Sequence, residues 1–312
     1  MIAGRQRSIG IGRETTWGTP VVPATFFNAT ESISEERGRL REEFIFGSRS
    51  TAPADPGRLR ITGSISGIHV RPRDIGHILR AATTAPSTSG TVTFTHVFTP
   101  TVVAFSSESA LTPYSITVRR SPGMIHRYTG GNLTRLSLQQ ERDGVLTADT
   151  EWLARGVATA TDTAMVLETG TRFRYRHLAV TRNAVAFPHV ESLRINLDNA
   201  LETEENFNQT DEISAIGFGG NSSIAIEMTL RFQDAPSYTD FSTNAVNPWV
   251  FTWTIDANNS LAISIPRLNI GSWGSPTGGP GRMTIDIGAT AEFDSVAGHD
   301  IRFTLVNNVA TY

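Results

Sequence analysis

Seven histidines are the side chains of this sequence best suited to acid–base chemistry or metal binding. They are widely separated, and no two occur at the close spacings that bring imidazoles together on a zinc ion. The chain contains no cysteine, which excludes thiolate metal sites, cysteine nucleophiles and disulfides. We therefore predict no metal site, and we expect solvated or strand-face side chains at His69, His77, His96, His126, His177, His189 and His299.

Nucleophilic catalysis and nucleotide binding have no convincing motif either. Residues 298–300 (GHD) join a His to an Asp, but no Gly-x-Ser-x-Gly nucleophile motif accompanies them. Residues 9–14 (IGIGRE) contain Gly-x-Gly without the third glycine and without the strand–turn–helix unit of a dinucleotide site. We therefore expect no catalytic residue, no cofactor and no enzymatic activity.

Two pairs of adjacent glutamates, at 42–43 and 204–205, are the remaining candidates for chemistry. A glycosidase needs two carboxylates, but such a pair cannot be identified from sequence alone. Both pairs lie in long polar segments, 34–50 and 200–214, each of which follows a predicted strand. The ordinary interpretation is a solvated loop. Because the first segment mixes charges densely and the two lie at corresponding places, we interpret them as protein–protein contact loops.

The composition is that of a folded protein with a core. Of the 312 residues, 39% are apolar and 18% are charged, which suits one large β domain or two domains of about 150 residues. No apolar run is long enough to span a membrane, and the first residues lack the apolar segment of a secretory signal. We expect a soluble protein made inside a cell.

Charge is distributed unevenly, although the net charge is only −3. Residues 1–160 carry 18 Arg against 13 Asp and Glu, whereas residues 161–312 carry 9 Arg against 17 Asp and Glu. These charges are scattered through patterned sequence, unlike an acidic tail or a basic nucleic-acid patch. We interpret the two halves as complementary surfaces through which one copy meets the next.

Period-two alternation of apolar and polar residues dominates the chain and predicts half-buried strands. Helical spacing of apolar residues is convincing in one segment, 71–82, where Asp74 is placed to cap the helix start. The fold class is therefore mainly β with one flanking helix. The predicted strands are 58–70, 114–120, 132–140, 145–154, 192–198, 222–232, 249–256, 261–268, 283–293 and 301–308.

The order of these segments recurs after about 140–160 residues, which indicates an internal duplication. We therefore predict two tandem β-sandwich or barrel domains, 25–158 and 159–312, preceded by an N-terminal arm, 1–24. The second domain is expected to lack a full helix and to carry a longer Gly/Pro loop. The matching segments are 31–36 with 191–196, 58–70 with 222–232, 93–98 with 249–255, and 146–152 with 287–293.

The N-terminal arm contains the segment 12–20, GRETTWGTP, which has no strand pattern and no evident partner strand. Trp17 is an indole in a segment too polar to form a core. We expect it to bury itself against a neighbouring subunit, because Trp is enriched at energetically dominant contacts. The alternative is that the arm folds back and Trp17 covers its own domain.

This segment resembles the signature of the major tail tube proteins of long-tailed bacteriophages, Gly-x-Glu-Thr-x-Trp-Gly-Thr-Pro. The resemblance covers most of the first half, whereas the second half is similar only in its strand pattern. The signature positions are Gly12, Glu14, Thr15, Trp17, Gly18, Thr19 and Pro20. The further similar segments are 25–34, 46–50, 62–67, 74–82, 93–100 and 128–156.

The resemblance implies a structural protein of the phage tail, assembled in the host cytoplasm, with no membrane insertion. Subunits of this family are β-sandwiches that form stacked rings, and their inner sheets close into a barrel wall. The lumen holds the tape-measure protein and later conducts double-stranded DNA, and the tube ends meet the tail terminator and the distal tail or baseplate proteins. Two tube domains in one chain imply a trimer with pseudo-sixfold symmetry.

Contacts between subunits are expected from the arm and from the two charged loops, the parts least explained by folding. The lumen should be neutral to acidic, since each Arg–phosphate contact would hold the DNA. The competing interpretation is a β-sandwich binding module of a virion, such as a decoration protein or adhesin. The candidate contact residues are Arg13, Glu14, Trp17, Pro20, Arg37, Arg39, Arg41, Glu42, Glu43, Arg49, Glu202, Glu204 and Glu205.

Overall fold

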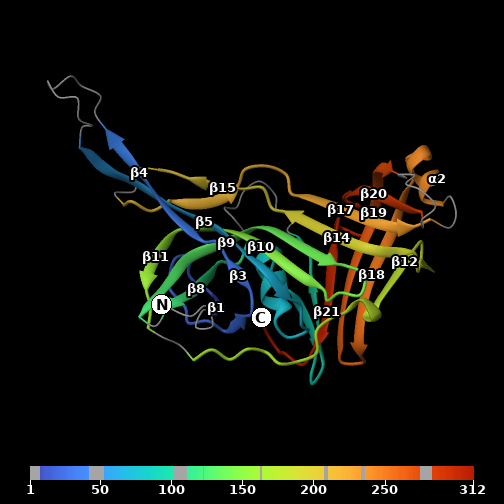
Figure 1. The fold of residues 1–312 in the computed structure, drawn as a ribbon, viewed down its shortest axis with the longest axis horizontal. Helices are drawn as coiled ribbons and strands as arrows, with labels where there is room; N and C mark the ends of the chain where they lie inside the picture. Colours follow the sequence, from blue (N-terminus) through green and yellow to red (C-terminus); the bar gives the residue numbers. More distant parts are fainter. Residues whose placement is uncertain are drawn as a thin grey trace.

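Alternating burial organises most of the chain into antiparallel strands, as predicted (Figure 1). In β17 (Ser223–Arg231), Ile224, Ile226, Met228 and Leu230 are at most 2% exposed, while the residues between them are more open. This is the pattern of a strand with one face on a core. The computed structural model describes residues 8–41, 53–100, 111–121, 123–161, 164–206, 210–232, 236–274 and 283–312.

The two halves of the described chain each contain a series of strands and one helix. The first half comprises β1 Ser8–Arg13, β2 Thr25–Phe27, β3 Thr30–Glu31, β4 Ser34–Arg41, β5 Ala54–His69, α1 Ile75–Ala82, β6 Ser87–Gly90, β7 Phe94–Phe98, β8 Tyr114–Ser121, β9 Met124–Gln140, β10 Thr147–Ala154 and β11 Gly156–Thr159. The second half comprises η2 Tyr175–His177, β12 Leu178–Arg182, β13 Val185–Ala186, β14 Val190–Asp198, β15 Leu201–Glu204, β16 Ala215–Phe218, β17, α2 Pro236–Thr243, β18 Val246–Asp256, β19 Asn259–Gly274, β20 Thr284–Ala291 and β21 Arg302–Asn307.

Strand pairing follows the same order in both halves. In the first half β4 pairs with β5, β5 with β10, β10 with β9 and β9 with β8. In the second half β14 pairs with β17, β17 with β20, β20 with β19 and β19 with β18. Each half also begins with a short hairpin, β1–β2 or β12–β13, whose first strand pairs with β8 or β18. We call these corresponding halves repeat 1 and repeat 2.

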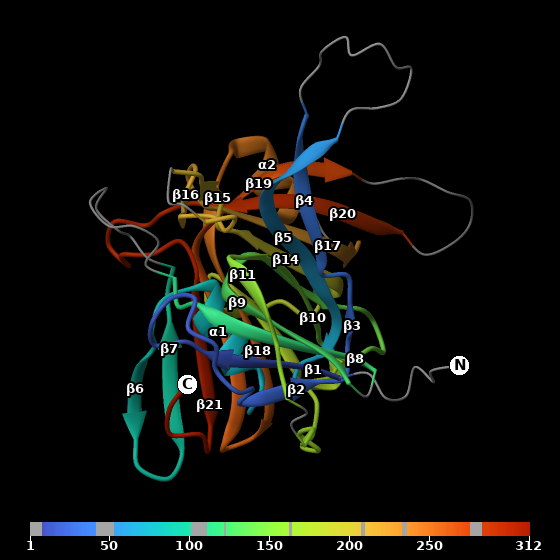
Figure 2. The same ribbon diagram turned by 90° about the vertical axis from the view of Figure 1, so that its left-hand side faces the viewer.

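Strand β7 of repeat 1 pairs with β21 of repeat 2, and a second antiparallel joint, β9 to β14, connects the sheets of the two repeats side by side. Its register runs from Leu193 opposite Gln140 to Asp198 opposite Arg135. Through this joint the strands β4, β5, β10, β9, β14, β17, β20 and β19 follow one another in a continuous sheet. Figure 2 shows the β4–β5 hairpin projecting beyond the body of the molecule.

The long strands β9 and β19 each run through both layers of their repeat. The C-terminal half of β9 pairs with β10, and its N-terminal half pairs with β8 and β11. In the same way β19 pairs with β20 near its C-terminal end and with β21 near its N-terminal end. The core between the layers therefore includes side chains from both sheets, among them Tyr114, Tyr128, Trp249 and Phe303, each at most 1% exposed.

Two expectations about the helices need correction. The sequence predicted a full helix only in repeat 1, but α2 in repeat 2 is eight residues long, the same length as α1. Asp74 precedes α1, as predicted, but its side chain forms no capping hydrogen bond. It accepts instead from the Thr25 hydroxyl at 3.2 Å.

The expectation that the N-terminal arm lacks a partner strand is wrong for its described part. Residues 8–13 form β1, which pairs with both β2 and β8. Ile9 and Ile11 are buried, at 3% and 0% exposed. The reason is that β1–β2 is the first hairpin of repeat 1, so it belongs to the domain and only its connection, residues 14–24, is irregular.

Candidate functional site

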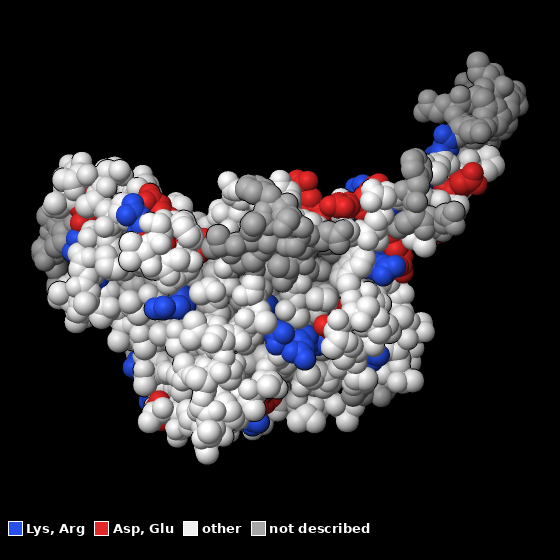
Figure 3. Space-filling view, turned by 180° about the vertical axis from the view of Figure 1, so that it is seen from behind, with Lys and Arg blue, Asp and Glu red and all other residues white. Residues whose placement is uncertain are grey.

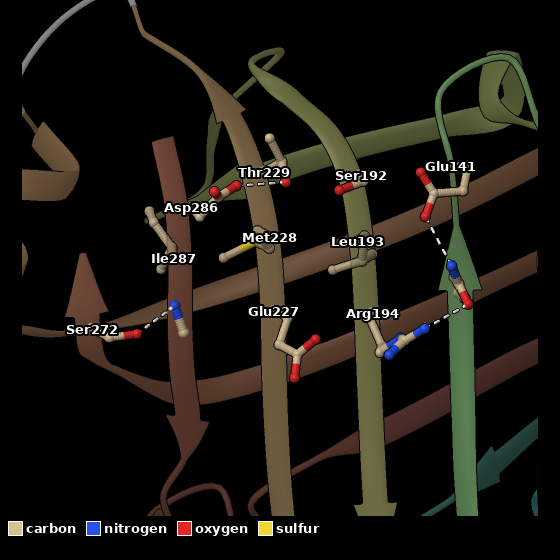
Figure 4. Close-up of a pocket in the computed structure, with 12 residues that line it drawn as sticks. Glu141, Ser192, Leu193, Arg194, Glu227, Met228, Thr229, Ser272, Asp286 and Ile287 are labelled. Atoms are coloured by element: carbon tan, nitrogen blue, oxygen red, sulfur yellow. Dashed lines mark hydrogen bonds between the residues drawn. The ribbon is translucent and has the colours of Figure 1, made fainter. Parts of the chain in front are cut away.

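The side of the continuous sheet that points away from the core carries small polar and charged side chains. On β14, Arg194 and Asp198 lie on this side, whereas Ile195 and Leu197 are buried. We call this side the polar face. Two hollows of about 470 and 540 Å³ lie along it, lined largely by residues of β9, β10, β14, β17 and β20 (Figure 4).

Carboxylates outnumber arginines in these two hollows. Arg135 bridges β10 and β14, because it donates to Glu151 at 3.3 Å and to Asp198 at 2.7 Å. Arg194 donates to the Gln139 amide oxygen at 3.0 Å (Figure 4). Both guanidinium groups are thus already engaged. The charged lining consists of Arg135 and Arg194 against Glu141, Asp149, Glu151, Asp198, Glu227 and Asp286.

Asp198 is held in its charged form at the joint between the repeats. Its partial burial opposes ionisation, but hydrogen bonds from Arg135 and from the Ala200 N–H lower the pKa of Asp198 below its usual value. The carboxylate therefore stays ionised at neutral pH. The lining of the two hollows is therefore negative overall, which disfavours the approach of polyanions.

The Arg135–Glu151 pair has a counterpart in repeat 2. Arg267 of β19 lies opposite Glu292, whose N–H donates to the Arg267 carbonyl at 2.8 Å, and the two side chains form an ion pair at 3.0 Å. The corresponding register on β9 and β10 places Arg135 opposite Glu151. Arg135 takes a further partner, Asp198, from the next repeat, whereas the strand on the other side of Arg267 is β18 of its own repeat.

The continuous sheet has an unpaired edge at each end. Every residue of β4 is exposed, and among the described residues β4 pairs with β5 alone. At the other end, β18 follows β19 as far as the pair Val246–Asn269. Beyond it, residues 270–274 have β20 on one side and no described strand on the other. Such edges present free backbone N–H and C=O groups to another chain.

Glu14 is the buried centre of the N-terminal segment, at 3% exposed. One carboxylate oxygen accepts from the Ser115 hydroxyl at 2.6 Å and the Gly130 N–H at 2.9 Å, and the other accepts from the Gly18 N–H at 2.8 Å. Hydrogen bonds of this kind replace the hydration that a carboxyl group loses on burial. Glu14 therefore fastens the 14–24 connection to β8 and β9.

Trp17 contacts its own chain in the described structure. Its indole N–H donates to the Gly130 carbonyl at 3.1 Å, and the Arg155 guanidinium lies 4.8 Å from the ring centroid. Arg155 in turn pairs with Glu212 of repeat 2 at 2.9 Å. This arrangement matches the alternative in which the arm folds back, and it links the indole through Arg155 to the second repeat.

A family model described as phage tail tube protein matches residues 4–295. The chain belongs to the phage tail tube protein family. The match extends across both repeats, so it reaches well beyond the segments of the first half. The protein is accordingly a structural component of the virion tail that assembles as part of that tail. No curated protein matches the chain.

The charged contact candidates of this tail tube protein meet one another within the chain. Arg37 of β4 pairs with Asp211, and Arg60 of β5 pairs with Glu205 at 2.7 Å. The described residues between β15 and β16 thus contact the β4–β5 hairpin. Figure 3 shows acidic and basic side chains gathered along this projection.

The other candidates divide into engaged, exposed and undescribed residues. Arg13 donates to the Tyr312 main-chain oxygen at 2.6 Å, so it is engaged within the chain as Glu14 is. The exposed ones are Pro20, Arg39, Arg41, Glu202 and Glu204. Glu42, Glu43 and Arg49 lie outside the described residues.

Sequence reasoning missed the residues that join the repeats. Asn199 follows β14 and donates to the carbonyls of Ala82, at the end of α1, and Leu133, at 3.1 and 3.0 Å. Asp211 and Glu212 sit in an acidic loop whose partners come from the other half. Nothing local in the sequence marks these pairings, because each depends on the β9–β14 joint.

Within the described residues, no group of three or more His, Asp or Glu side chains is placed to hold a metal ion. No helix in the same part of the chain is long and apolar enough to cross a membrane.

Proposed function

We propose that this tail tube protein assembles head to tail into closed rings of three copies, and that these rings stack into the hollow tube of a long-tailed phage. The observation that carries the proposal is the repeated pairing order, with the repeats joined at β9–β14 and one unpaired edge left at each end. A contact between two different edges is heterologous. Such a contact forms a ring when the rotation from one subunit to the next returns to the first subunit.

Three copies follow from the two repeats in each chain together with the sixfold arrangement of tube domains that the family resemblance implies. The β9–β14 joint places repeat 2 beside repeat 1 in one sheet, with the polar face shared by both. A contact of similar geometry between chains continues that arrangement from repeat to repeat. A ring of six repeats then needs three chains, which gives threefold symmetry and an approximate sixfold axis.

The polar face is the proposed lining of the lumen. In its two hollows the carboxylates exceed the arginines, and both arginines there are held by neighbouring side chains. Because each free Lys or Arg that meets a phosphate adds affinity by counterion release, this lining would let double-stranded DNA pass without being held. In the assembling tail it would surround the tape-measure protein, and the ends of the tube would meet the terminator and the distal tail or baseplate proteins.

Solution mass and negative-stain microscopy of the concentrated full chain test this function. The expected result is a trimer, or stacked rings with a central channel and threefold class averages. A chain that stays monomeric at every concentration and binds glycans would contradict the proposal and support a virion binding module instead.

A further inference from the structure

The β9–β14 joint shows how one repeat receives the next. Asn196 of β14 lies opposite Ser137 of β9, and Ile195 lies opposite Leu138. Just beyond β14, the Asn199 amide donates to the Ala82 carbonyl, so it covers the C-terminal end of α1. The first strand of repeat 2 therefore fills the space between the edge of β9 and the end of the helix in repeat 1.

Repeat 2 has a hollow at the corresponding place. Leu138 lies opposite Ala148 on β10, and Ile270 lies opposite Ala289 on β20 in the same register, so Ile270 of β19 corresponds to Leu138 of β9. A hollow of about 370 Å³ opens beside Ile270. Its lining includes Phe241 of α2, Asn244 and Gly271.

The apolar surface around this hollow is unusually open. Tyr238 and Phe241 of α2 are 49% and 37% exposed. In α1, by contrast, Ile75, Ile78 and Leu79 are all at most 1% exposed. Exposed aromatic side chains beside an unpaired strand edge are typical of a surface that another protein covers.

The segment that corresponds to β14 in repeat 1 has an unpaired edge. Glu31 of β3 lies opposite Ile65 on β5, as Leu197 of β14 lies opposite Ile224 on β17. The other side of β3 has no strand partner among the described residues, and the same holds for β4, which continues it. The hollow in repeat 2 and this edge in repeat 1 therefore correspond to the two sides of the β9–β14 joint, which the chain contains in complete form.

We propose that the edge of β19 from residue 270 to 274, with the hollow beside α2, is the docking site for the β3–β4 edge of a second copy of this chain. The incoming strand adds to β19 as β14 adds to β9, and main-chain hydrogen bonds supply the register. Strand β18 already pairs with β19 as far as Asn269, so the incoming strand can pair with β19 only from residue 270 onward. It therefore lies nearer to the C-terminal end of β19 than β14 lies to the C-terminal end of β9. This docking rests on the proposed ring and specifies its contact.

Engineered disulfides test the docking directly, because the chain has no cysteine of its own. The internal joint places Arg194 opposite Gln139. Ser272 lies opposite Gly288 as Gln139 lies opposite Thr147, and Asn28, just before β3, is three residues from Glu31 as Arg194 is from Leu197; Asn28 and Ser272 are both exposed. Under mild oxidation, the Asn28→Cys/Ser272→Cys chain should form covalent dimers and trimers on a non-reducing gel. Adjacent antiparallel strands bring such side chains within disulfide reach.

Two matched pairs control for this result. The Ser137→Cys/Asn196→Cys chain bridges the internal joint, so it should lose both free thiols without gaining mass. The Val92→Cys/Ser272→Cys chain pairs the same β19 position with an exposed residue in the β6–β7 turn, and it should yield few multimers. Multimers from this third chain at the level of the first would overturn the proposed contact.

A blocking substitution gives an independent readout. A Cβ added at Gly271 meets nothing nearer than the Gly288 carbonyl at 3.9 Å, so Gly271→Trp should fold normally while its indole fills the hollow. We expect its self-association constant to fall at least tenfold. Gly220→Trp is the control, because a Cβ there meets nothing nearer than Ala200 at 3.8 Å and the site lies outside the hollow.

The outcomes separate the docking from the function. Rings from the unmodified chain, with no multimers from Asn28→Cys/Ser272→Cys and normal assembly of Gly271→Trp, would refute the docking site and leave the tube function intact. An unmodified chain that forms no rings would refute the ring, and the docking with it.

Discussion

At the scale of single residues, Glu14 and Asp74 are two buried carboxyl groups that differ in how many hydrogen bonds they accept. Glu14 accepts three hydrogen bonds and fastens the 14–24 connection. Asp74 accepts one, from the Thr25 hydroxyl, and lies near the Glu168 carboxylate. The hydrogen bonds of Glu14 therefore hold the connection in place, whereas burial of Asp74 disfavours its charged form.

Replacing Glu14 should destabilise the chain markedly. Glu14→Ala leaves the Gly18 and Gly130 N–H groups and the Ser115 hydroxyl without their acceptor, which costs about 3 kcal/mol of unfolding free energy. Denaturant unfolding measures the loss. Glu36→Ala, at an exposed position of β4, is the control and should change stability by less than about 0.5 kcal/mol. Equal effects from the two substitutions would mean that the Glu14 hydrogen bonds contribute little.

Asp74 predicts a pH dependence of stability. Burial, reinforced by Glu168, raises the pKa of Asp74 from 3.8 to about 6. Between about pH 4 and pH 6 the folded chain holds a proton that the unfolded chain has released, so this stabilisation is lost as pH rises through that window. Asn cannot ionise. The stability of Asp74→Asn relative to the unmodified chain should therefore increase by about 1–2 kcal/mol from pH 4 to pH 6.5. A relative stability that is flat or falls over this window would contradict the assignment.

At the scale of elements, the β1–β2 hairpin and α2 show what sequence pattern can and cannot reveal. The alternating strands and α1 were predictable because one face of each is apolar. In β1 the alternation is Ile–Gly–Ile–Gly, and this segment was assigned to the N-terminal arm. A Cβ at Gly10 would lie 2.7 Å from Pro23 Cβ, and one at Gly12 would lie 2.4 Å from the Val22 carbonyl. These glycines let the chain pack closely within a strand.

The helix α2 escaped prediction for a different reason. Its buried side chains are polar, with Ser237 and Asp240 each 5% exposed. Asp240 accepts from the Arg182 guanidinium at 2.8 Å, and Ser237 accepts from the Trp273 indole N–H at 3.3 Å. Apolar periodicity cannot find a helix that is anchored by hydrogen bonds to strands distant in sequence. The same limit applies to the polar face. The outward residues of each strand can be predicted from alternation, but which of them share a hollow depends on the order of the strands in the sheet.

The pairing of β1 predicts that the hairpin is needed for folding. Ile11→Ala should cost about 2–5 kcal/mol of unfolding free energy, because Ile11 is fully buried. Deleting residues 1–24 removes β1 altogether and should abolish cooperative unfolding. Val22→Ala, at a position 54% exposed in the same segment, is the control. A truncated chain that melts like the full one would show that β1 is dispensable.

At the scale of the whole molecule, the arrangement of charge governs what the protein meets. The polar face is acidic, and the projecting β4–β5 hairpin carries arginines. In the proposed tube the first surface meets DNA and the second meets other copies. We therefore expect DNA binding at the first surface and self-association at the second to depend on salt in different ways.

Reversing charge on the polar face should create DNA affinity. Glu227→Arg with Asp286→Arg adds cations in the hollow drawn in Figure 4. Duplex DNA should then bind more tightly, and the slope of log K against log salt should steepen by about 1–2. Fluorescence anisotropy measures both quantities. Glu202→Arg with Glu204→Arg makes the same change of charge on β15, outside the two hollows, and should alter DNA binding less.

Reversing charge on the hairpin should weaken self-association. Arg39 and Arg41 are exposed on β4, and the Arg39→Glu/Arg41→Glu chain should associate several-fold more weakly at low salt. The difference should shrink as salt rises, because exposed charges are screened. Sedimentation velocity measures this, with Arg231→Glu/Arg302→Glu as the charge-matched control. A loss that is the same at every salt concentration would mean that these arginines act through packing.

The covalent link between the repeats has a further consequence for how a tube forms and breaks. In a ring of three chains, every second junction between repeats is the β9–β14 joint, formed during folding and independent of protein concentration. The alternate junctions form only when chains collide. Half of the six junctions are thus already connected, so a ring needs only three contacts between separate chains where six single-repeat chains would need six. Under load the two kinds of seam differ, so a strained or bent tube should open along three lines between chains and keep the internal joints closed.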